Sequence, residues 1–192
     1  MTGCMRSTAE KTKTRFSLEL EVKIRQCRRQ DLPQLEWFSL YTEHRQLIQD
    51  AFRRQQHGEV IMLVADLDDF PVGQAWLDLR AREADSVGVI WALRVFPLLR
   101  NRGIGTRLMV AAEHLLSERG YRWVELTVDQ QEPRPRRLYE RLGYRAAGST
   151  EGLLSYITPE EKSVALNLQL WILRKRLQPE AIKWEVSQTS RE

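Results

Sequence analysis

The sequence predicts an α/β fold in which helices cover a single β-sheet. The chain has 192 residues, of which 42% are apolar and 29% charged, and this size and composition suit one domain with its own core. Its central part runs in the order strand, glycine-rich turn, helix, strand, helix, strand. Strands that alternate with helices in this way are typical of a helix-covered sheet.

The two ends of the chain differ from this central part. Residues 1–17 are rich in Thr, Ser, Lys and Arg and show no periodicity, so we expect an N-terminal tail. Residues 179–192 are expected to form a C-terminal tail. The domain itself is therefore predicted over residues 18–178.

The domain is expected to begin with a strand and a short helix. Residues 18–27 alternate apolar and charged side chains, as a half-buried strand does. A short helix is predicted over 31–38, where Asp31 can serve as the N-cap and Pro33 is tolerated in the first turn. A longer helix is predicted over 41–58, ending at a glycine.

The middle of the chain carries the clearest periodicity. Apolar, branched runs predict strands at residues 59–66, 72–80 and 86–95. The helical spacing and the alternating patterns that follow predict a helix at 104–119, a strand at 121–128, a helix at 134–143 and a strand at 144–148. Residues 149–163 look like a loop of unknown role. Residues 165–177 fit either a strand or a helix, and periodicity alone leaves both open.

Several classes of site have no support in the sequence. Cys4 and Cys27 are spaced neither for a zinc site nor for a redox pair, so we expect reduced, structural thiols. His44, His57 and His114 lack metal-binding spacing, and no metal is predicted. No apolar run approaches the roughly 18 residues of a membrane-spanning helix, and no secretion signal is evident. We therefore expect a cytoplasmic protein without a membrane partner.

The positive charge of the chain is not spread evenly along the sequence. The net charge is +4 and the isoelectric point is about 9.3, which alone fits a nucleic acid, a phosphorylated ligand or no charged partner. The arginines cluster in two short segments, which are Arg94, Arg100, Arg102 and Arg107, and then Arg134, Arg136 and Arg137. No recognised nucleic-acid motif accompanies them. We therefore expect no nucleic-acid partner.

Residues 98–109, LLRNRGIGTRLM, place arginines and two glycines directly ahead of a helix. The first N–H groups of a helix lack partners within the helix, and the helix dipole leaves partial positive charge there. This segment is therefore a candidate site for an anionic group such as a phosphate. A tight turn that only packs the strand against the helix is the structural alternative.

Two phosphate-binding motifs fit this segment poorly. A P-loop requires Gly-Lys-Ser/Thr, whereas Thr106 and Arg107 follow Gly105. A dinucleotide-binding turn requires a third small residue where Leu108 stands, and it should follow its strand at once. Here Pro97 and two leucines intervene.

A third pattern fits well. The residues from Arg100 to Gly105 match the Arg/Gln-x-x-Gly-x-Gly/Ala pyrophosphate loop of the GNAT superfamily of acetyl-CoA-dependent N-acetyltransferases. About thirty residues later, RRLYERLGYR resembles the Leu-Tyr-x-x-x-Gly-Phe segment of that superfamily, with Tyr144 in place of phenylalanine. The resemblance is strongest over residues 90–147.

The resemblance implies a fold and a cofactor site. The GNAT fold is a single mixed central sheet of six to seven strands, flanked by about four helices, with its fourth and fifth strands splayed. It makes residues 168–177 the final strand. Acetyl-CoA would lie between the splayed strands as the co-substrate. Main-chain groups of Leu93, Arg94 and Val95 would hydrogen-bond the amides of its arm. The turn that holds its pyrophosphate would be formed by Arg100, Asn101, Arg102, Gly103, Ile104, Gly105 and Thr106. Glu132, which departs from the pattern of the family, is a further candidate contact of the cofactor arm, with the acceptor or solvent as alternatives.

The same resemblance assigns a catalytic role to Tyr139. With an ordinary pKa near 10, a tyrosine stays protonated at neutral pH and can protonate the leaving thiolate. Many relatives carry an asparagine where this chain has Glu132 and a small residue where it has Pro135. A glutamate base found in some relatives is replaced here by Thr127, so the resemblance supplies no general base.

The acceptor also stays open. Glu43, Asp78, Glu125 and Asp129 are candidate bases by their position alone, and a chain of water molecules is another route for the proton. We expect transfer of the acetyl group to a primary amine of a small molecule or a peptide. The alternative is a GNAT-like module that binds acyl-CoA for sensing or scaffolding. The oligomeric state, including a homodimer, is not determined by the sequence.

Overall fold

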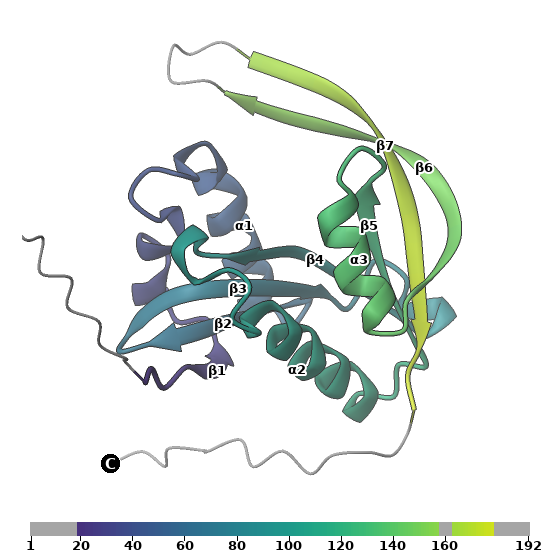
Figure 1. Cartoon of the computed structure of the whole chain (residues 1–192), viewed down its shortest axis with the longest axis horizontal. Coiled ribbons are helices and arrows are strands. Elements are labelled where there is room, and N and C mark those ends of the chain that lie inside the picture. Colours follow the sequence, from purple (N-terminus) through teal and green to yellow (C-terminus); the bar gives the residue numbers. More distant parts are fainter. Residues whose placement is uncertain (1–18, 158–162, 179–192) are drawn as a thin grey trace, which may run out of the picture.

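The computed structural model describes residues 19–157 and 163–178 (Figure 1). Within them the chain forms one seven-stranded sheet in the order β1-β2-β3-β4-β5-β7-β6. Its strands are β1 (Lys23–Gln26), β2 (Val60–Leu67), β3 (Phe70–Asp78), β4 (Val87–Val95), β5 (Trp123–Asp129), β6 (Arg145–Ile157) and β7 (Ser163–Arg176). Only β4 and β5 pair in parallel. The predicted mixed sheet is confirmed.

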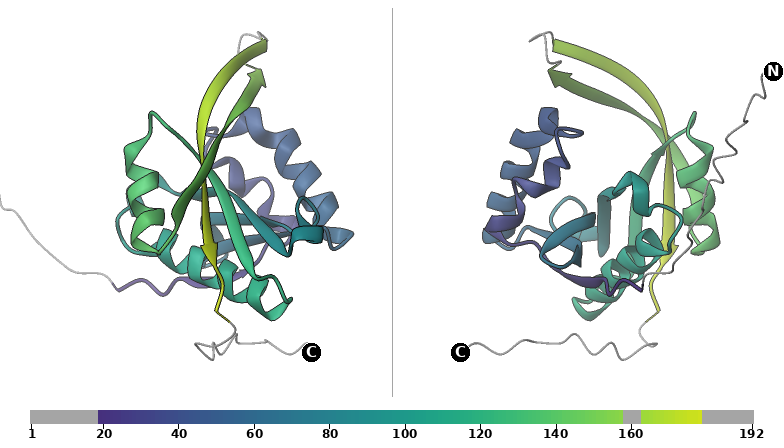
Figure 2. Two further views of the ribbon diagram at one scale, coloured as in Figure 1. Left: turned by 90° about the vertical axis from the view of Figure 1, so that its right-hand side faces the viewer. Right: turned by 60° about the vertical axis from the view of Figure 1, so that its left-hand side comes forward.

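Helices cover both faces of this sheet. The described residues form three α-helices, which are α1 (Arg45–Gln56), α2 (Ile104–Glu118) and α3 (Pro133–Arg141). They also form the 3-10 helices η1 (Arg29–Asp31), η2 (Gln34–Glu36), η3 (Thr42–His44), η4 (Glu83–Asp85) and η5 (Pro97–Leu99). α1 lies on one face, whereas α2 and α3 lie on the other (Figures 1 and 2). None of these described helices has the length and apolar character needed to cross a membrane.

The sheet separates two apolar layers, one beneath each set of helices. The layer under α1 includes Ile48, Phe52, Met62, Val64 and Trp76. The layer under α2 and α3 includes Leu63, Leu77, Leu108, Leu126 and Tyr139. α2 packs closely on its face, because a Cβ on Gly73 would lie 3.1 Å from side-chain carbons of Ile104 and Leu108. This contact fixes the first turn of α2 relative to the strands.

The N-terminal part differs from its prediction. The strand is shorter than expected, and the helix predicted over 31–38 is wrong, because η1 and η2 occupy this region. Asp31 does not cap a following helix. Its carboxylate accepts hydrogen bonds from the Arg25 guanidinium and from the backbone N–H of Arg28. Trp37 ends η2 in a left-handed conformation, and its indole N–H donates to the Pro71 carbonyl at 2.6 Å.

The larger difference from the predicted fold lies in residues 149–177. The loop predicted over 149–163 is wrong for the described residues, because β6 continues to Ile157 and pairs with β7 along its length. β7 also confirms the strand alternative for residues 165–177. Beyond the register of β5, the two strands pair only with each other and project from the sheet (Figures 1 and 2). The cross-strand pairing with β7, which involves residues distant in the chain, makes this segment a strand.

The remaining predicted elements are confirmed with small shifts at their ends. α1 is followed by Gly58, and α2 by Gly120, and both glycines have positive φ. Asp68 and Asp69 form the turn between β2 and β3, each with positive φ. The predictions for residues 1–17 and 179–192 lie outside the described residues.

Candidate active site

The turn ahead of α2 gathers main-chain donors. Gly103 is the N-cap of α2 and has a φ of 82°, and Asn101 also has a positive φ, 61°. No acceptor within the described residues pairs with the backbone N–H groups of residues 102–106. These groups lie at the positive end of the helix dipole. The turn therefore offers an anion a row of hydrogen-bond donors.

The two glycines of this turn are not equivalent. At Gly103 a side chain would meet a strained backbone, and its Cβ would lie 2.6 Å from a guanidinium nitrogen of Arg107. Gly105 lies within α2, and its Cβ would make ordinary contacts, 3.7 Å from Val95 and 3.8 Å from Leu138. Only the first position requires glycine. This agrees with a pattern that accepts alanine at the second.

Two arginines border the same turn. Arg100 and Arg102 are exposed, and neither forms an ion pair with another described residue. The Arg100 side chain donates a hydrogen bond from Nε to the Val95 carbonyl at 3.1 Å. This bond holds its positive charge next to the end of β4.

β4 and β5 pair over only three residues each. Their parallel register joins Val87–Val89 of β4 to Trp123–Glu125 of β5. Beyond it, the rest of β5 pairs with β7, and residues 90–95 of β4 have no partner on that side within the described chain. The predicted splay of these two strands is confirmed. Leu93, Arg94 and Val95 all lie in the separated part of β4.

Tyr139 lies on α3, with its side chain nearly buried against Tyr144. The ring centroids are 5.9 Å apart in an edge-to-face arrangement. Burial raises the pKa of Tyr139 to about 12, because a phenolate is poorly solvated there. The hydroxyl therefore stays protonated across the physiological range and can act as a donor.

The structure brings several of the predicted site residues together. A Cβ on Gly105 would contact side chains of Val95 at the end of β4 and of Leu138 beside Tyr139. The splayed strand, the turn and α3 therefore meet at the first turn of α2. Glu132 is exposed at the N-cap of α3, and its side chain forms no hydrogen bond or ion pair within residues 19–157 and 163–178.

Pro135 does not disrupt α3, which begins at Pro133 and continues to Arg141. A proline is tolerated at this depth because the first N–H groups of a helix have no acceptor within it. Pro135 therefore leaves the helix that carries Tyr139 intact.

Two of the candidate bases are already engaged. The Glu125 carboxylate accepts hydrogen bonds from Arg82 at 2.7 Å and from Arg174 at 2.6 Å. Asp78 accepts from Arg54 at 2.8 Å and from two backbone N–H groups. Burial alone raises the pKa of Asp78, but these hydrogen bonds outweigh it and lower the pKa below its ordinary value. Both carboxylates are therefore held in ion pairs with arginines.

The opposite face of β4 holds a group of residues that the sequence did not single out. Arg94 points toward the α1 face, where its guanidinium carbon lies 4.7 Å from the ring centroid of Tyr41. His44 stacks at a tilt on Tyr41. Burial, followed by the charge of Arg94, lowers the pKa of His44. Its imidazole is therefore neutral at neutral pH.

A β-bulge explains why this group was missed. Trp76 of β3 pairs with Trp91, and Gln74 pairs with Arg94, so β4 has one residue more than β3 over this stretch. Ala92 takes up the extra residue with a φ of 53°. Strict alternation would place Trp91 and Arg94 on opposite faces, whereas the bulge puts them on the same one.

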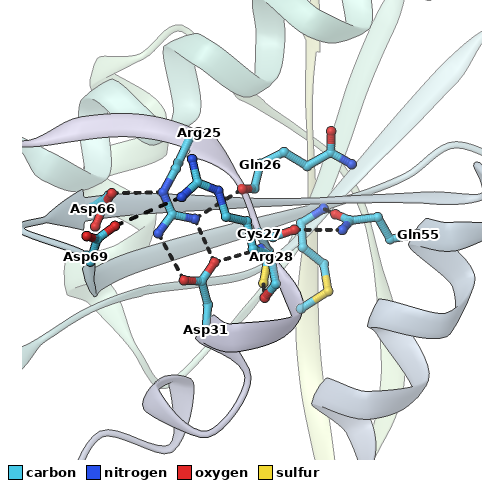
Figure 3. A network of polar contacts seen from close by, with 9 residues as sticks. Arg25, Gln26, Cys27, Arg28, Asp31, Gln55, Asp66 and Asp69 are labelled. Carbon is cyan, nitrogen blue, oxygen red and sulfur yellow. Dashed lines mark hydrogen bonds and ion pairs between the residues drawn. The ribbon is translucent and has the colours of Figure 1, made fainter. Parts of the chain in front are cut away.

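Arg94 is one end of a row that crosses four strands. The register places Arg25, Val64, Gln74 and Arg94 side by side on β1, β2, β3 and β4. At the far end, Arg25 donates to Asp31 and Asp66 at distances between 2.6 and 2.9 Å (Figure 3). Asp31 is completely buried. At one end of the row, Arg25 is paired with two carboxylates. At the other end, Arg94 is paired with none among the described residues.

No metal site is evident in this part of the molecule. Across residues 19–157 and 163–178, no group of three or more His, Cys, Asp or Glu side chains is arranged to hold an ion. Cys27 is a buried free thiol. Burial raises its pKa to about 12, so the thiol is unreactive at neutral pH.

Comparison with known proteins identifies the class. A profile of the acetyltransferase (GNAT) family matches residues 27–144, which is more than half of the chain. The chain belongs to the GNAT acetyltransferase family. A mycothiol acetyltransferase from Rhodococcus erythropolis is 33% identical over 88 residues. That stretch is 44% of this chain and 29% of the relative, so the match spans less than a third of that protein.

Solved structures share the fold. An N-acetyltransferase from Staphylococcus aureus Mu50 has a TM-score of 0.65 at 16% identity, covering 82% of this chain and 99% of that one. Arabidopsis thaliana NAA60 in complex with acetyl-CoA gives the same TM-score, identity and coverage. The ribosomal-protein-S18-alanine N-acetyltransferase from Escherichia coli has a TM-score of 0.61 at 16% identity, covering 86% and 98%.

Proposed function

We propose that this protein transfers the acetyl group of acetyl-CoA to a primary amine of a small molecule or a peptide. The observation that carries the proposal is the row of unpaired N–H groups over residues 102–106, which follows the part of β4 that is separated from β5. A diphosphate suits these donors and the two exposed arginines beside them. The gap between the strands can take an extended arm, and the edge of β4 from Leu93 to Val95 can pair with its amides.

The transfer needs few protein groups. The neutral amine attacks the thioester carbonyl carbon, and its nitrogen gives up one proton to water. The carbon–sulfur bond breaks, and the thiolate leaves with the bonding pair and takes a proton. Tyr139 is the group that we assign to that proton, because it is protonated, nearly buried and next to the point where the turn meets α3. Its raised pKa keeps the proton on the hydroxyl until the thiolate has formed.

Binding of acetyl-CoA is the first test. Calorimetry on the full chain should show binding by the wild type. Gly103→Ala should weaken it roughly tenfold, because the turn relaxes from a left-handed conformation that costs a side chain about 1–2 kcal/mol. Gly105→Ala is the matched control and should bind like the wild type. No binding by folded wild-type protein would overturn the proposal.

Turnover is the second test. Thiol release from acetyl-CoA, measured across amino acids, polyamines, aminoglycosides and peptides, should find an accepted amine. Tyr139→Phe should lower kcat by about 100-fold or more, with acetyl-CoA binding retained. An unchanged kcat would remove Tyr139 from the mechanism. Binding without thiol release for every amine would instead favour a sensing or scaffolding module.

A further inference from the structure

Buried polar atoms without partners are concentrated at one place on the α1 face. Among the described residues, eight buried side-chain nitrogen or oxygen atoms lack a hydrogen-bond partner. Five of the eight belong to Gln74, Trp76, Trp91 and Arg94. Four of those five are N–H donors. A buried donor without an acceptor is costly, so such a concentration points to a ligand that supplies acceptors.

The four residues form one surface across β3 and β4. Gln74 faces Arg94 and Trp76 faces Trp91 in the register of the two strands, and directly opposed residues share a face of the sheet. The Trp76 and Trp91 rings meet edge to face, with their centroids 4.8 Å apart. Gln74 is completely buried. Gln74 and Arg94 nevertheless form no hydrogen bond with each other.

Arg94 stands out from the other half-buried arginines. Arg25, Arg82 and Arg174 each reach at least one carboxylate at 2.6 to 2.8 Å. Arg94 has no ion pair with any described residue, and its Nη1 is buried without an acceptor. Burial lowers the pKa of Arg94, against the opposing influence of Tyr41 and Glu43. A guanidinium keeps its charge even so.

The walls of this region are also defined. Tyr41 lies beneath the guanidinium, and η3 follows it directly in the chain. β6 contacts η3 from the projecting hairpin. The site is therefore bounded by β3 and β4 and by the segment ahead of α1 that carries Tyr41. It lies on the opposite face of β4 from Leu93 and Val95, which pack toward α2.

We propose that Arg94 and Gln74 bind a carboxylate of the acceptor, so that the amine acetylated by this protein belongs to an amino acid. The proposal rests on the proposed function and names the substrate class of that site. A carboxylate matches the planar donors of a guanidinium and an amide, and it brings only acceptors and a negative charge. The ion pair would neutralise a positive charge that has no ion-pair partner among the described residues.

The test compares each amino acid with its own carboxamide, in thiol release from acetyl-CoA. The wild type should prefer the acid over the carboxamide by about 10- to 100-fold in kcat/KM, since hydrogen bonds to charged groups are among the stronger ones. Arg94→Gln keeps the main chain of β4 that we assign to the cofactor arm, so it should abolish that preference mainly through KM while the activity toward the carboxamide persists. Arg45 is an exposed arginine at the start of α1. Arg45→Gln is therefore the matched control and should keep the preference for the acid.

A binding experiment makes the test independent of turnover. Calorimetry with N-acetyl amino acids and their carboxamides, at saturating coenzyme A, should show tighter binding of the acids by the wild type and the loss of this difference in Arg94→Gln. Equal binding of acids and carboxamides, binding of neither, or a difference that survives in Arg94→Gln overturns the carboxylate site. Failure of folded protein to bind acetyl-CoA overturns the proposed function instead.

Discussion

The two ends of the row from Arg25 to Arg94 use the same residue type for opposite purposes. Arg25 is held by Asp31 and Asp66, so that one cation meets two carboxylates (Figure 3). Arg94 rests on an aromatic ring and meets no carboxylate in the described chain. The first arrangement links β1 to β2 and to η1. The second leaves the positive charge of Arg94 without a carboxylate and buried N–H donors without acceptors. Such unpaired groups destabilise the fold, and they are typical of sites where a ligand supplies the missing acceptors.

The comparison separates structural from functional polar groups by their pairing. Both arginines lie on the α1 face and neither is fully exposed. Burial alone therefore does not distinguish them. The decisive difference is whether the protein itself supplies the opposite charge. The predictions below test this difference from the largest expected effect to the smallest.

Removal of Arg25 should produce the largest loss of stability. Arg25→Met leaves the buried carboxylate of Asp31 and the partly buried carboxylate of Asp66 without their cation, and breaking a buried ion pair in this way costs about 3–5 kcal/mol. Denaturant unfolding measures the change in the free energy of unfolding. Arg45→Met removes an exposed ion pair and should cost less than about 1 kcal/mol. Equal losses in the two variants would contradict the structural role of Arg25.

Acid should weaken the Arg25 end of the row. Burial raises the pKa of Asp31, but its hydrogen bonds with Arg25 and with the Arg28 N–H outweigh this and lower the pKa below the ordinary 3.8. The stabilisation is therefore present above pH 3.8 and is lost as the pH falls through the lower pKa of the folded state. The difference in unfolding free energy between wild type and Asp31→Asn should shrink over that range. A difference independent of pH would contradict this account.

Removal of Arg94 should leave stability almost unchanged. Arg94→Met deletes a half-buried charge that has no carboxylate partner, and it loses only the contact with the Tyr41 ring. The two effects oppose each other, so we expect a change within about 1 kcal/mol. Denaturant unfolding of this variant beside Arg25→Met measures both ends of the row. A loss of several kcal/mol at Arg94 would show that its role is structural.

Protonation of His44 should give the smallest change in stability. This change should begin at a higher pH than the one that Asp31 causes. Burial and the charge of Arg94 lower the pKa of His44 from 6.5, so the unfolded chain binds this proton more readily than the folded one. Stability should therefore begin to fall as the pH drops below 6.5. In His44→Gln this part of the pH dependence should disappear. The same slope in both proteins would contradict the assignment.

Local sequence signals predicted most of the fold. The elements around α2, β5 and α3 were predicted because apolar periodicity and glycines mark their limits, and the turn from Arg100 to Thr106 carried its own motif. The predictions failed where tertiary contacts decide. Asp31 resembles a helix cap, but Arg25 takes its carboxylate. Residues 149–157 resemble a loop, but β7 supplies the hydrogen bonds that make them a strand.

The sequence by itself determined the family, the sheet and the place of the glycine turn, because these depend on periodicity and on short motifs that are contiguous in the chain. Only the tertiary structure decided which face Arg94 occupies, because one extra residue at Ala92 shifts the alternation of β4. It also decided that Arg25 is paired and Arg94 is not. Ion pairing depends on residues brought together from distant strands, and a linear pattern does not record that proximity.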